Sequence, residues 1–121
     1  MNTFAFKDLQ IWNRAVSYAD VVIDQIDQLN SDRKHFRLIE QLEAAVTSIA
    51  LNIAEGKGRQ HKKEFVQFLY ISRGSLYETV TLLNIFANRN WISQEKLKEL
   101  ESEGIEIANM LKGLINSIYK S

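Results

Sequence analysis

Apolar side chains recur at alternating steps of three and four residues along four successive segments of this 121-residue chain. The segments cover residues 9–29, 38–53, 65–86 and 97–118. This spacing places apolar groups on one face of an α-helix, and no segment competes with a strand pattern. The chain has no Pro to interrupt the helices, and the connections between them are short. We therefore predict an all-α fold, an antiparallel up-down-up-down four-helix bundle that forms a single domain over residues 1–121.

Several helix ends can be predicted from residue types that cap helices. Asp8 and Ser93 are the expected N-caps of the first and last helices. Gly56 is expected to end the second helix in a left-handed conformation, and the third helix is expected to begin near His61. Gly104 lies on the apolar row of the last helix, where the missing side chain would let another helix approach closely.

Composition excludes several classes of protein. The chain has no Cys, which rules out a disulfide framework, a thiolate nucleophile and a Cys-based zinc site. No apolar run approaches the roughly 20 residues of a membrane-spanning helix, and the N-terminus lacks the pattern of a signal peptide. We therefore expect a cytoplasmic protein without a membrane partner. The formal net charge is zero, although residues 31–73 carry eight Lys and Arg against five Asp and Glu.

Polar residues interrupt the apolar pattern of the second helix. Ser48, Asn52 and Glu55 follow one another at steps of four and three, so they line one side of the helix. Asn52 shares a row with apolar residues and is expected to be at least half buried. We favour the interpretation that these polar residues form a hydrogen-bonded network that fixes the register of the helices. A role in a ligand site or in a contact between subunits is the alternative.

Glu78 occupies an unusual position in the third helix. It lies between Ile71 and Ile85 on a seven-residue row, so we expect it to be enclosed and to need a partner such as Gln41, a serine hydroxyl or a cation. Antiparallel pairing of the second and third helices places Asn52 and Glu78 about 18 Å apart at 1.5 Å per residue. The two groups therefore cannot act on one small substrate.

Known catalytic and metal-binding patterns are missing from the sequence. No Glu-x-x-His pairs occur on two helices, as a di-iron or di-manganese bundle would require. The run 56–59 precedes a helix without a preceding strand and is not a phosphate loop, and Gly74-Ser75 lacks the setting of a nucleophile elbow. We therefore predict no enzyme activity, no cofactor and no metal site, and keep a hydrolase that uses Glu55 or Glu78 as a minor alternative.

Basic side chains gather at two places and are the candidate nucleic-acid-binding residues. The first set, in the turn between the second and third helices, is Lys57, Arg59, Lys62 and Lys63. The second set, ahead of and within the start of the second helix, is Arg33, Lys34 and Arg37. Such clusters can hold phosphates, and binding would weaken strongly with salt. The competing interpretation of both sets is a solvated surface without a ligand.

The motifs of the second and third helices resemble a known family. They include the structural motif residues Ser48, Asn52, Glu55, Gly56, Gly74, Ser75 and Glu78, together with Phe6-Lys7-Asp8-Leu9, Gln41-Leu42, Gly58-Arg59 and Glu64-Phe65. The set is similar to bacterial four-helix-bundle proteins named after the intervening sequences of 23S ribosomal RNA genes. That family also includes the accessory variability determinant of diversity-generating retroelements, a basic protein that binds nucleic acid and a reverse transcriptase.

The resemblance implies a bundle that assembles into a ring, most often a homopentamer. It implies a structural role for the seven motif residues. Two departures weaken nucleic-acid binding as an inherited property: Glu43 stands where members frequently carry Arg, and the overall charge is neutral. The usual Phe-Pro pair ahead of the second helix is also replaced, at residues 30–34. The alternative function is an assembly or adaptor protein whose ring presents a surface to a protein partner, without nucleic-acid binding.

Overall fold

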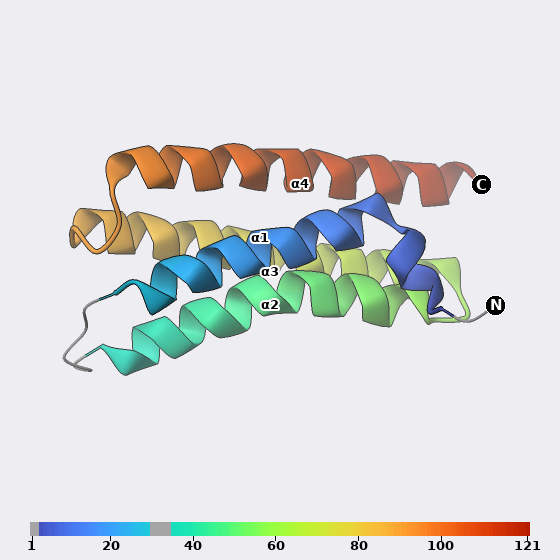
Figure 1. Cartoon of the computed structure of the whole chain (residues 1–121). Coiled ribbons are helices and arrows are strands. Elements are labelled where there is room, and N and C mark those ends of the chain that lie inside the picture. Colours follow the sequence, from blue (N-terminus) through green and yellow to red (C-terminus); the bar gives the residue numbers. More distant parts are fainter. Residues whose placement is uncertain (1–2, 30–34) are drawn as a thin grey trace.

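The computed structural model describes residues 3–29 and 35–121 and contains four long helices (Figure 1). They are α1 (Gln10–Asp27), α2 (Phe36–Lys57), α3 (Lys62–Asn88) and α4 (Gln94–Lys120), and a 3-10 turn, η1 (Ala5–Asp8), precedes α1. Each helix runs opposite to the one before it (Figure 1). The two described ranges contain no strand. The predicted all-α four-helix bundle is therefore confirmed.

Each helix of the bundle packs against two others. Both α1 and α3 contact α2 and α4, so α1 and α3 face each other across the diagonal. Twelve large side chains at the centre are completely or almost completely buried. They are Tyr18, Val22, Leu42, Val46, Ile49, Ile53, Leu69, Leu76, Leu83, Phe86, Ile107 and Leu111. Burial of each such aliphatic or aromatic group contributes roughly 1.5–3 kcal/mol, so this core is the main source of stability.

The start of α1 differs from the prediction. Asp8 is not its N-cap, because it lies inside η1, and α1 begins at Gln10 after Leu9. An N-cap needs extended backbone, which Leu9 has and a residue within a 3-10 turn lacks. The ring of Phe6 packs against Trp12 at 5.1 Å between centroids, which ties η1 to α1. By contrast, Ser93 caps α4 as predicted, since its hydroxyl accepts a hydrogen bond from the Lys96 amide.

The buried face of α1 is also rotated from the predicted one. We predicted a stripe of Leu9, Trp12, Val16, Ala19, Ile23 and Ile26, widened by Ala15, Val22 and Leu29. The buried residues are Ile11, Ala15, Tyr18, Ala19 and Val22, so the buried row is shifted toward Ile11 and Tyr18, which the prediction did not include. The two rows are adjacent on the helix, and a wide apolar stripe does not distinguish them. The pattern was misread because Tyr18 carries a hydroxyl and was not counted as a core residue.

Tyr18 is a core residue whose hydroxyl has a specific partner. It donates a hydrogen bond of 3.0 Å to the Leu100 carbonyl oxygen in α4. Burial raises the pKa of Tyr18 above its ordinary range, and the charges of Glu103 and Glu101 act in the same direction. The group therefore stays protonated and remains a donor. A Cβ added at Gly104 would lie 3.4 Å from the Tyr18 hydroxyl, which is ordinary van der Waals contact, so this hydroxyl does not require the glycine that we predicted to serve a close approach of helices.

Replacing Tyr18 by Phe should lower the free energy of unfolding by about 1 kcal/mol, because it removes one hydrogen bond and keeps the ring. Chemical denaturation followed by circular dichroism measures the change. Tyr119→Phe is the matched control, since Tyr119 is exposed and its replacement should leave the stability unchanged. An equal effect of the two substitutions would contradict a specific role for the Tyr18–Leu100 hydrogen bond.

Gly56 does not end α2 in a left-handed conformation, contrary to our prediction. The helix continues through Lys57, and the only non-glycine residue with positive φ in the described ranges is Asn90; no described glycine has it. The reason for a glycine is packing. A Cβ at Gly56 would lie 2.7 Å from the Phe68 Cβ and 2.9 Å from the Phe65 Cδ1, closer than carbon atoms can approach. Gly56 therefore lets the start of α3 pack directly on the end of α2.

Candidate functional site

The polar residues between α2 and α3 form a hydrogen-bonded seam. The hydroxyls of Ser48 and Ser75 lie 2.8 Å apart, and the Asn52 amide donates to both the hydroxyl and the carbonyl oxygen of Ser48, each at 2.8 Å. The buried Ser72 hydroxyl donates to the Ile49 carbonyl oxygen at 2.9 Å. Among the described residues, no buried side-chain nitrogen or oxygen lacks a partner. Asn52 is half buried, as predicted, and the bonds that join α2 to α3 in this seam are Ser48–Ser75 and Ser72–Ile49.

Glu78 has one of the partners that we predicted, Gln41, but it lies at the surface and not in the interior. Its carboxylate accepts a hydrogen bond of 3.2 Å from the Gln41 amide, but Glu78 is exposed and not enclosed. Our prediction of burial was wrong because the row that Glu78 shares with Ile71 and Ile85 faces outward. Ile71 is 52% exposed and Ile85 is 38% exposed in a single copy of the chain. Two isoleucines on a row are therefore no proof of an inward face.

The carboxylates considered for catalysis lie far apart along the bundle. Glu55 is exposed and pairs with Arg59 at 3.3 Å, whereas Glu78 contacts Gln41 near the opposite end of α2. Glu55 follows Gln41 by 14 positions in α2, which corresponds to about 21 Å of helix. Paired acid-base chemistry needs two groups within reach of one reacting centre, and this arrangement does not provide them.

Aromatic rings position two basic side chains in the turn between α2 and α3. The Arg59 guanidinium lies 4.7 Å from the centre of the Phe68 ring and also contacts Glu55. The Lys57 ammonium lies 5.8 Å from the centre of the Phe65 ring. The rings themselves pack on Gly56, so the same close approach that joins the helices holds the cations in place. A cation over a ring keeps its charge and its exposed donors.

The N-terminus of α3 lies among these cations. His61 occupies the N-cap position and makes no side-chain hydrogen bond to the helix. The first N–H groups of an α-helix have no intrahelical acceptor, and they carry partial positive charge. Lys62 and Lys63 follow at once; Lys62 donates to the Ser121 carbonyl oxygen, and Lys63 is exposed. Glu64, also in the first turn of α3, offsets part of this positive charge. Uncapped N–H groups beside several cations are nevertheless suited to bind a phosphate or carboxylate.

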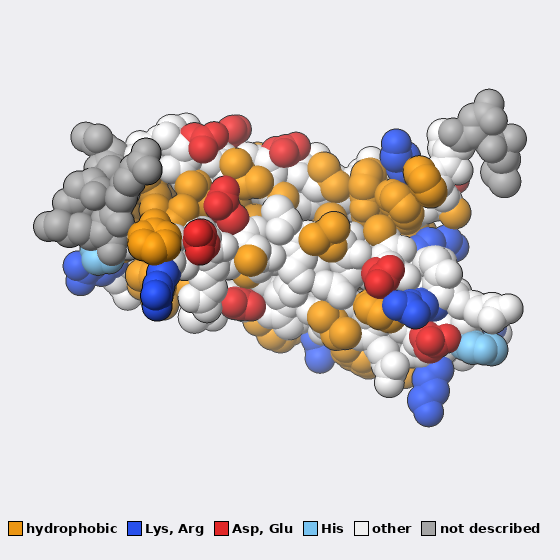
Figure 2. Space-filling view, turned by 90° about the horizontal axis from the view of Figure 1, so that it is seen from below, with side chains coloured by type: hydrophobic (Ala, Val, Ile, Leu, Met, Phe, Trp, Pro, Cys, Tyr) orange, Lys and Arg blue, Asp and Glu red, His pale blue; other side chains and the backbone are white. Residues whose placement is uncertain are grey.

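Arg37, the one member of the second basic set that the structure describes, is at the other end of the bundle. Arg33 and Lys34 lie outside the described residues, and Arg37 is exposed in the first turn of α2. The 22 residues of α2 span about 33 Å and separate Arg37 from the turn at Lys57. Figure 2 shows that Lys and Arg side chains on one face lie mainly toward its two ends, with apolar side chains along the middle. Arg37 and the basic turn therefore cannot form one compact site in a single copy.

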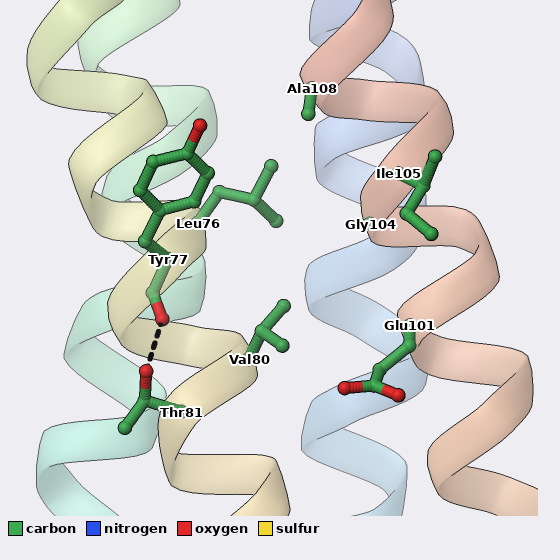
Figure 3. Close-up of a pocket in the computed structure, with 8 residues that line it drawn as sticks. All are labelled: Leu76, Tyr77, Val80, Thr81, Glu101, Gly104, Ile105 and Ala108. Carbon is green, nitrogen blue, oxygen red and sulfur yellow. Dashed lines mark hydrogen bonds between the residues drawn. The ribbon is translucent and has the colours of Figure 1, made fainter.

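A groove between α3 and α4 was not predicted from the sequence. It has a volume of about 440 Å³, and Figure 3 shows that residues from both helices line it. They are Leu76, Tyr77, Val80, Thr81, Glu101, Gly104, Ile105 and Ala108. Glu101 is its one charged group and accepts a hydrogen bond of 2.9 Å from the Asn84 amide. The walls are otherwise mostly apolar, so the groove fits apolar side chains better than a polar substrate.

Residues 7–113 match the family model of the 23S rRNA-intervening sequence proteins. The chain belongs to this family. A crystal structure of a protein with unknown function from the S23 ribosomal protein family of Bacteroides thetaiotaomicron is similar, with a TM-score of 0.80. The sequences are 23% identical, over 87% of this chain and 97% of that chain, so this likeness concerns the fold. No curated protein matches the chain. The predicted family is thus confirmed.

In this member of the 23S rRNA-intervening sequence protein family, two further properties bear on the site. Within residues 3–29 and 35–121, no three His, Asp or Glu side chains lie close enough to hold a metal ion. None of the helices described is long and apolar enough to cross a membrane. The sequence contains a signal for the groove that was not predicted, because Tyr77 and Ile105 are large apolar residues outside the predicted core rows.

Proposed function

We propose that this chain binds nucleic acid, RNA or DNA, as an oligomer and without catalysing a reaction. The observation that carries the proposal is the coincidence of the uncapped N-terminus of α3 with the basic set Lys57, Arg59, Lys62 and Lys63. Positive side chains at a helix N-terminus repel the helix dipole, and a bound anion removes this cost. A phosphate of the nucleic-acid backbone is the anion that several such groups can share.

The geometry of the basic turn supports contacts to the sugar-phosphate backbone of a nucleic acid rather than to its bases. The rings of Phe65 and Phe68 are half buried against α2, so they are not free to stack on bases. The rings hold Lys57 and Arg59 in place, which reduces the side-chain entropy lost on binding. One copy offers about four phosphate contacts. If several copies in one oligomer bind the same nucleic acid, the overall affinity exceeds that of a single copy.

The wild-type chain should bind structured RNA at about 50 mM salt, with a steep loss of affinity as salt increases. Replacing Lys62 and Lys63 together by Gln should lower affinity roughly 10- to 100-fold and reduce the salt slope by about 1.5, since two phosphate contacts are lost. Fluorescence anisotropy across a salt series, with RNA and duplex DNA probes, measures both quantities.

The matched control replaces Lys96 and Lys98 by Gln near the start of α4. It removes the same charge at the opposite end of the bundle, so affinity and slope should change little. The proposal fails if the wild-type chain does not bind at about 50 mM salt, where phosphate contacts are strongest. It also fails if the control pair weakens binding as much as Lys62→Gln with Lys63→Gln.

The oligomeric part of the proposal follows from the family resemblance, from which we expect a homopentamer.

A second candidate function is an assembly or adaptor protein that presents a surface to a protein partner. It is favoured by the exposed apolar side chains of α3 and α4, which are unusual for a helix face in water. A pull-down of the tagged chain from its host distinguishes the two candidate functions. Recovery of nucleic acid without a protein partner would count against the adaptor function.

A further inference from the structure

Two exposed tyrosine rings lie along one side of α3. Tyr70 is 42% exposed and Tyr77 is 56% exposed. They are seven positions apart, so they share a side of the helix and are separated by about 10.5 Å along its axis. Tyr77 also forms part of the α3 wall of the groove (Figure 3). Within the described residues, neither ring belongs to the buried core, so both present a flat aromatic surface to a ligand.

Arg73 joins the two rings into one cluster. Its guanidinium lies 4.8 Å from the centre of the Tyr70 ring and 5.7 Å from the centre of the Tyr77 ring. It can cover only one face of each ring. A cation held against a ring keeps its charge and its outward donors. The cluster therefore places a group that can bind phosphate between two surfaces on which bases can stack.

The cluster continues the basic turn along α3. Lys63, in the first turn of the helix, precedes Tyr70 by seven positions and therefore shares a row with both tyrosines. The row from Lys63 to Tyr77 is about 21 Å long, the length of roughly six stacked nucleotides at about 3.4 Å each. A strand that is held at the basic turn can thus reach both rings.

The positive charge along this row suits a phosphate backbone. Lys63 and Arg73 lie on α3, and the exposed Lys112 lies on α4, seven positions from the groove residue Ile105 in the direction of the basic turn. Glu64, which follows Lys63 directly, offsets one of these cations. The remaining positive charge is complementary to a nucleic acid and gives nothing to a neutral ligand.

Carboxylates limit how far a nucleic acid can follow the row. Glu101 borders the groove and accepts a hydrogen bond of 2.9 Å from the Asn84 amide, seven positions past Tyr77 on α3. Glu78 follows Tyr77 directly, but it points toward α2, where it accepts a hydrogen bond of 3.2 Å from the Gln41 amide. A phosphate would be repelled beyond Tyr77, so the path of the strand ends there.

We propose that Tyr70 and Tyr77 stack on the bases of a single-stranded nucleic acid whose phosphates contact Lys63 and Arg73. The inference rests on the proposed function and adds its substrate class, an unpaired segment such as a loop of a structured RNA. In a duplex the bases stack on one another and cannot reach the rings, whereas unpaired bases can. Stacking on an aromatic ring tolerates any sequence, because every base has a flat face. The ligand is therefore recognised by its unpaired state and not by its sequence.

Fluorescence anisotropy tests the proposal with the full chain, a single-stranded RNA of about 12 nucleotides and a duplex of the same length. Tyr70→Leu with Tyr77→Leu should lower the affinity for the single strand roughly 20-fold or more, because two stacking surfaces are lost. The affinity for the duplex and the salt slope should not change, since no charge is removed. The matched control, Tyr70→Phe with Tyr77→Phe, keeps both rings and should bind like the wild type. Circular dichroism confirms that the variants fold.

Photo-crosslinking gives a second readout that does not depend on affinity. Ultraviolet light joins a base to an aromatic side chain stacked on it, and mass spectrometry identifies the residue. The single strand should crosslink to Tyr70 or Tyr77 and not to Phe36, which is 53% exposed at the opposite end of α2.

Equal affinity of the wild type and the double Leu variant for the single strand overturns the stacking site, as does a wild type that crosslinks through neither tyrosine. In both cases, binding that depends on Lys62 and Lys63 still supports the proposed function. A wild type that binds neither the single strand nor the duplex at about 50 mM salt overturns the proposed function together with the stacking site.

Discussion

Replacing Gly56 by Val is expected to lower the free energy of unfolding by about 3 kcal/mol. The added Cβ would lie 2.7 Å from the Phe68 Cβ and 3.2 Å from the Phe65 carbonyl oxygen. Neither atom can move as the far end of a flexible side chain could, so the start of α3 must shift away from α2. Thermal and urea denaturation measure the loss. The displaced rings of Phe65 and Phe68 would also release Lys57 and Arg59, so nucleic-acid affinity should fall modestly.

Gly113→Ala is the matched control for Gly56→Val. Gly113 lies within α4 with no atom within 4 Å of an added Cβ, so Ala there should raise stability by about 1 kcal/mol through helix propensity alone. The two glycines thus predict effects of opposite sign. If Gly56→Val were as stable as the wild type, the conclusion that the end of α2 packs closely on the start of α3 would be wrong.

The bundle could be predicted from the sequence because its signals are local. Seven-residue apolar rows, a serine at the start of α4 and the absence of Pro each depend only on neighbouring residues. The contact between Gln41 and Glu78 could be predicted as well, since antiparallel helices joined by a short turn pair residues whose numbers have a nearly constant sum. The contact between Ser48 and Ser75 follows from the same register, whereas Asn52 donates to Ser48 one turn earlier in its own helix.

The errors arose where two explanations share one local pattern. Gly56 fits both a helix end and a close contact, and only the position of Phe68 in space distinguishes them. The row of Ile71, Glu78 and Ile85 fits both a core face and an interface, and the single chain leaves it exposed. Tyr18 was missed because a hydroxyl in a core needs one acceptor, and the Leu100 carbonyl lies 82 residues away in sequence.

The candidate site was predicted in composition but not in arrangement. The basic residues of the turn were identified, yet the rings that hold Lys57 and Arg59 were assigned to the core alone. The sequence showed two basic sets without the distance between them, and the structure places Arg37 at the end of the bundle opposite Lys57. Distances of this kind depend on the length of α2 and on its direction, so charge clusters need the fold before they can be joined into a site.

Replacing Phe86 by Ala should lower the free energy of unfolding by about 3–5 kcal/mol, the largest effect expected in this chain. Phe86 is only 1% exposed and meets the Trp91 ring edge-on at 4.9 Å. Its carbonyl oxygen also accepts the Trp91 amide hydrogen bond, which folds the connection to α4 back onto the bundle. The His35 ring, directly before α2, also packs against Trp91, at 4.8 Å between ring centroids. Loss of Phe86 therefore loosens the end where α2, α3 and α4 meet, and Trp fluorescence should report a more exposed indole before global unfolding.

Two further variants separate packing from a general loss of an aromatic ring. Phe86→Leu keeps most of the apolar volume and should cost about 1.5 kcal/mol, since only part of the cavity remains. Phe36→Ala removes a ring that is 53% exposed at the start of α2, so stability should change by less than about 0.5 kcal/mol. If Phe36→Ala were as damaging as Phe86→Ala, then Phe36 would be buried in the working protein. Light scattering on that variant would then show whether a neighbouring copy covers this end, because a contact between copies would make its stability depend on protein concentration.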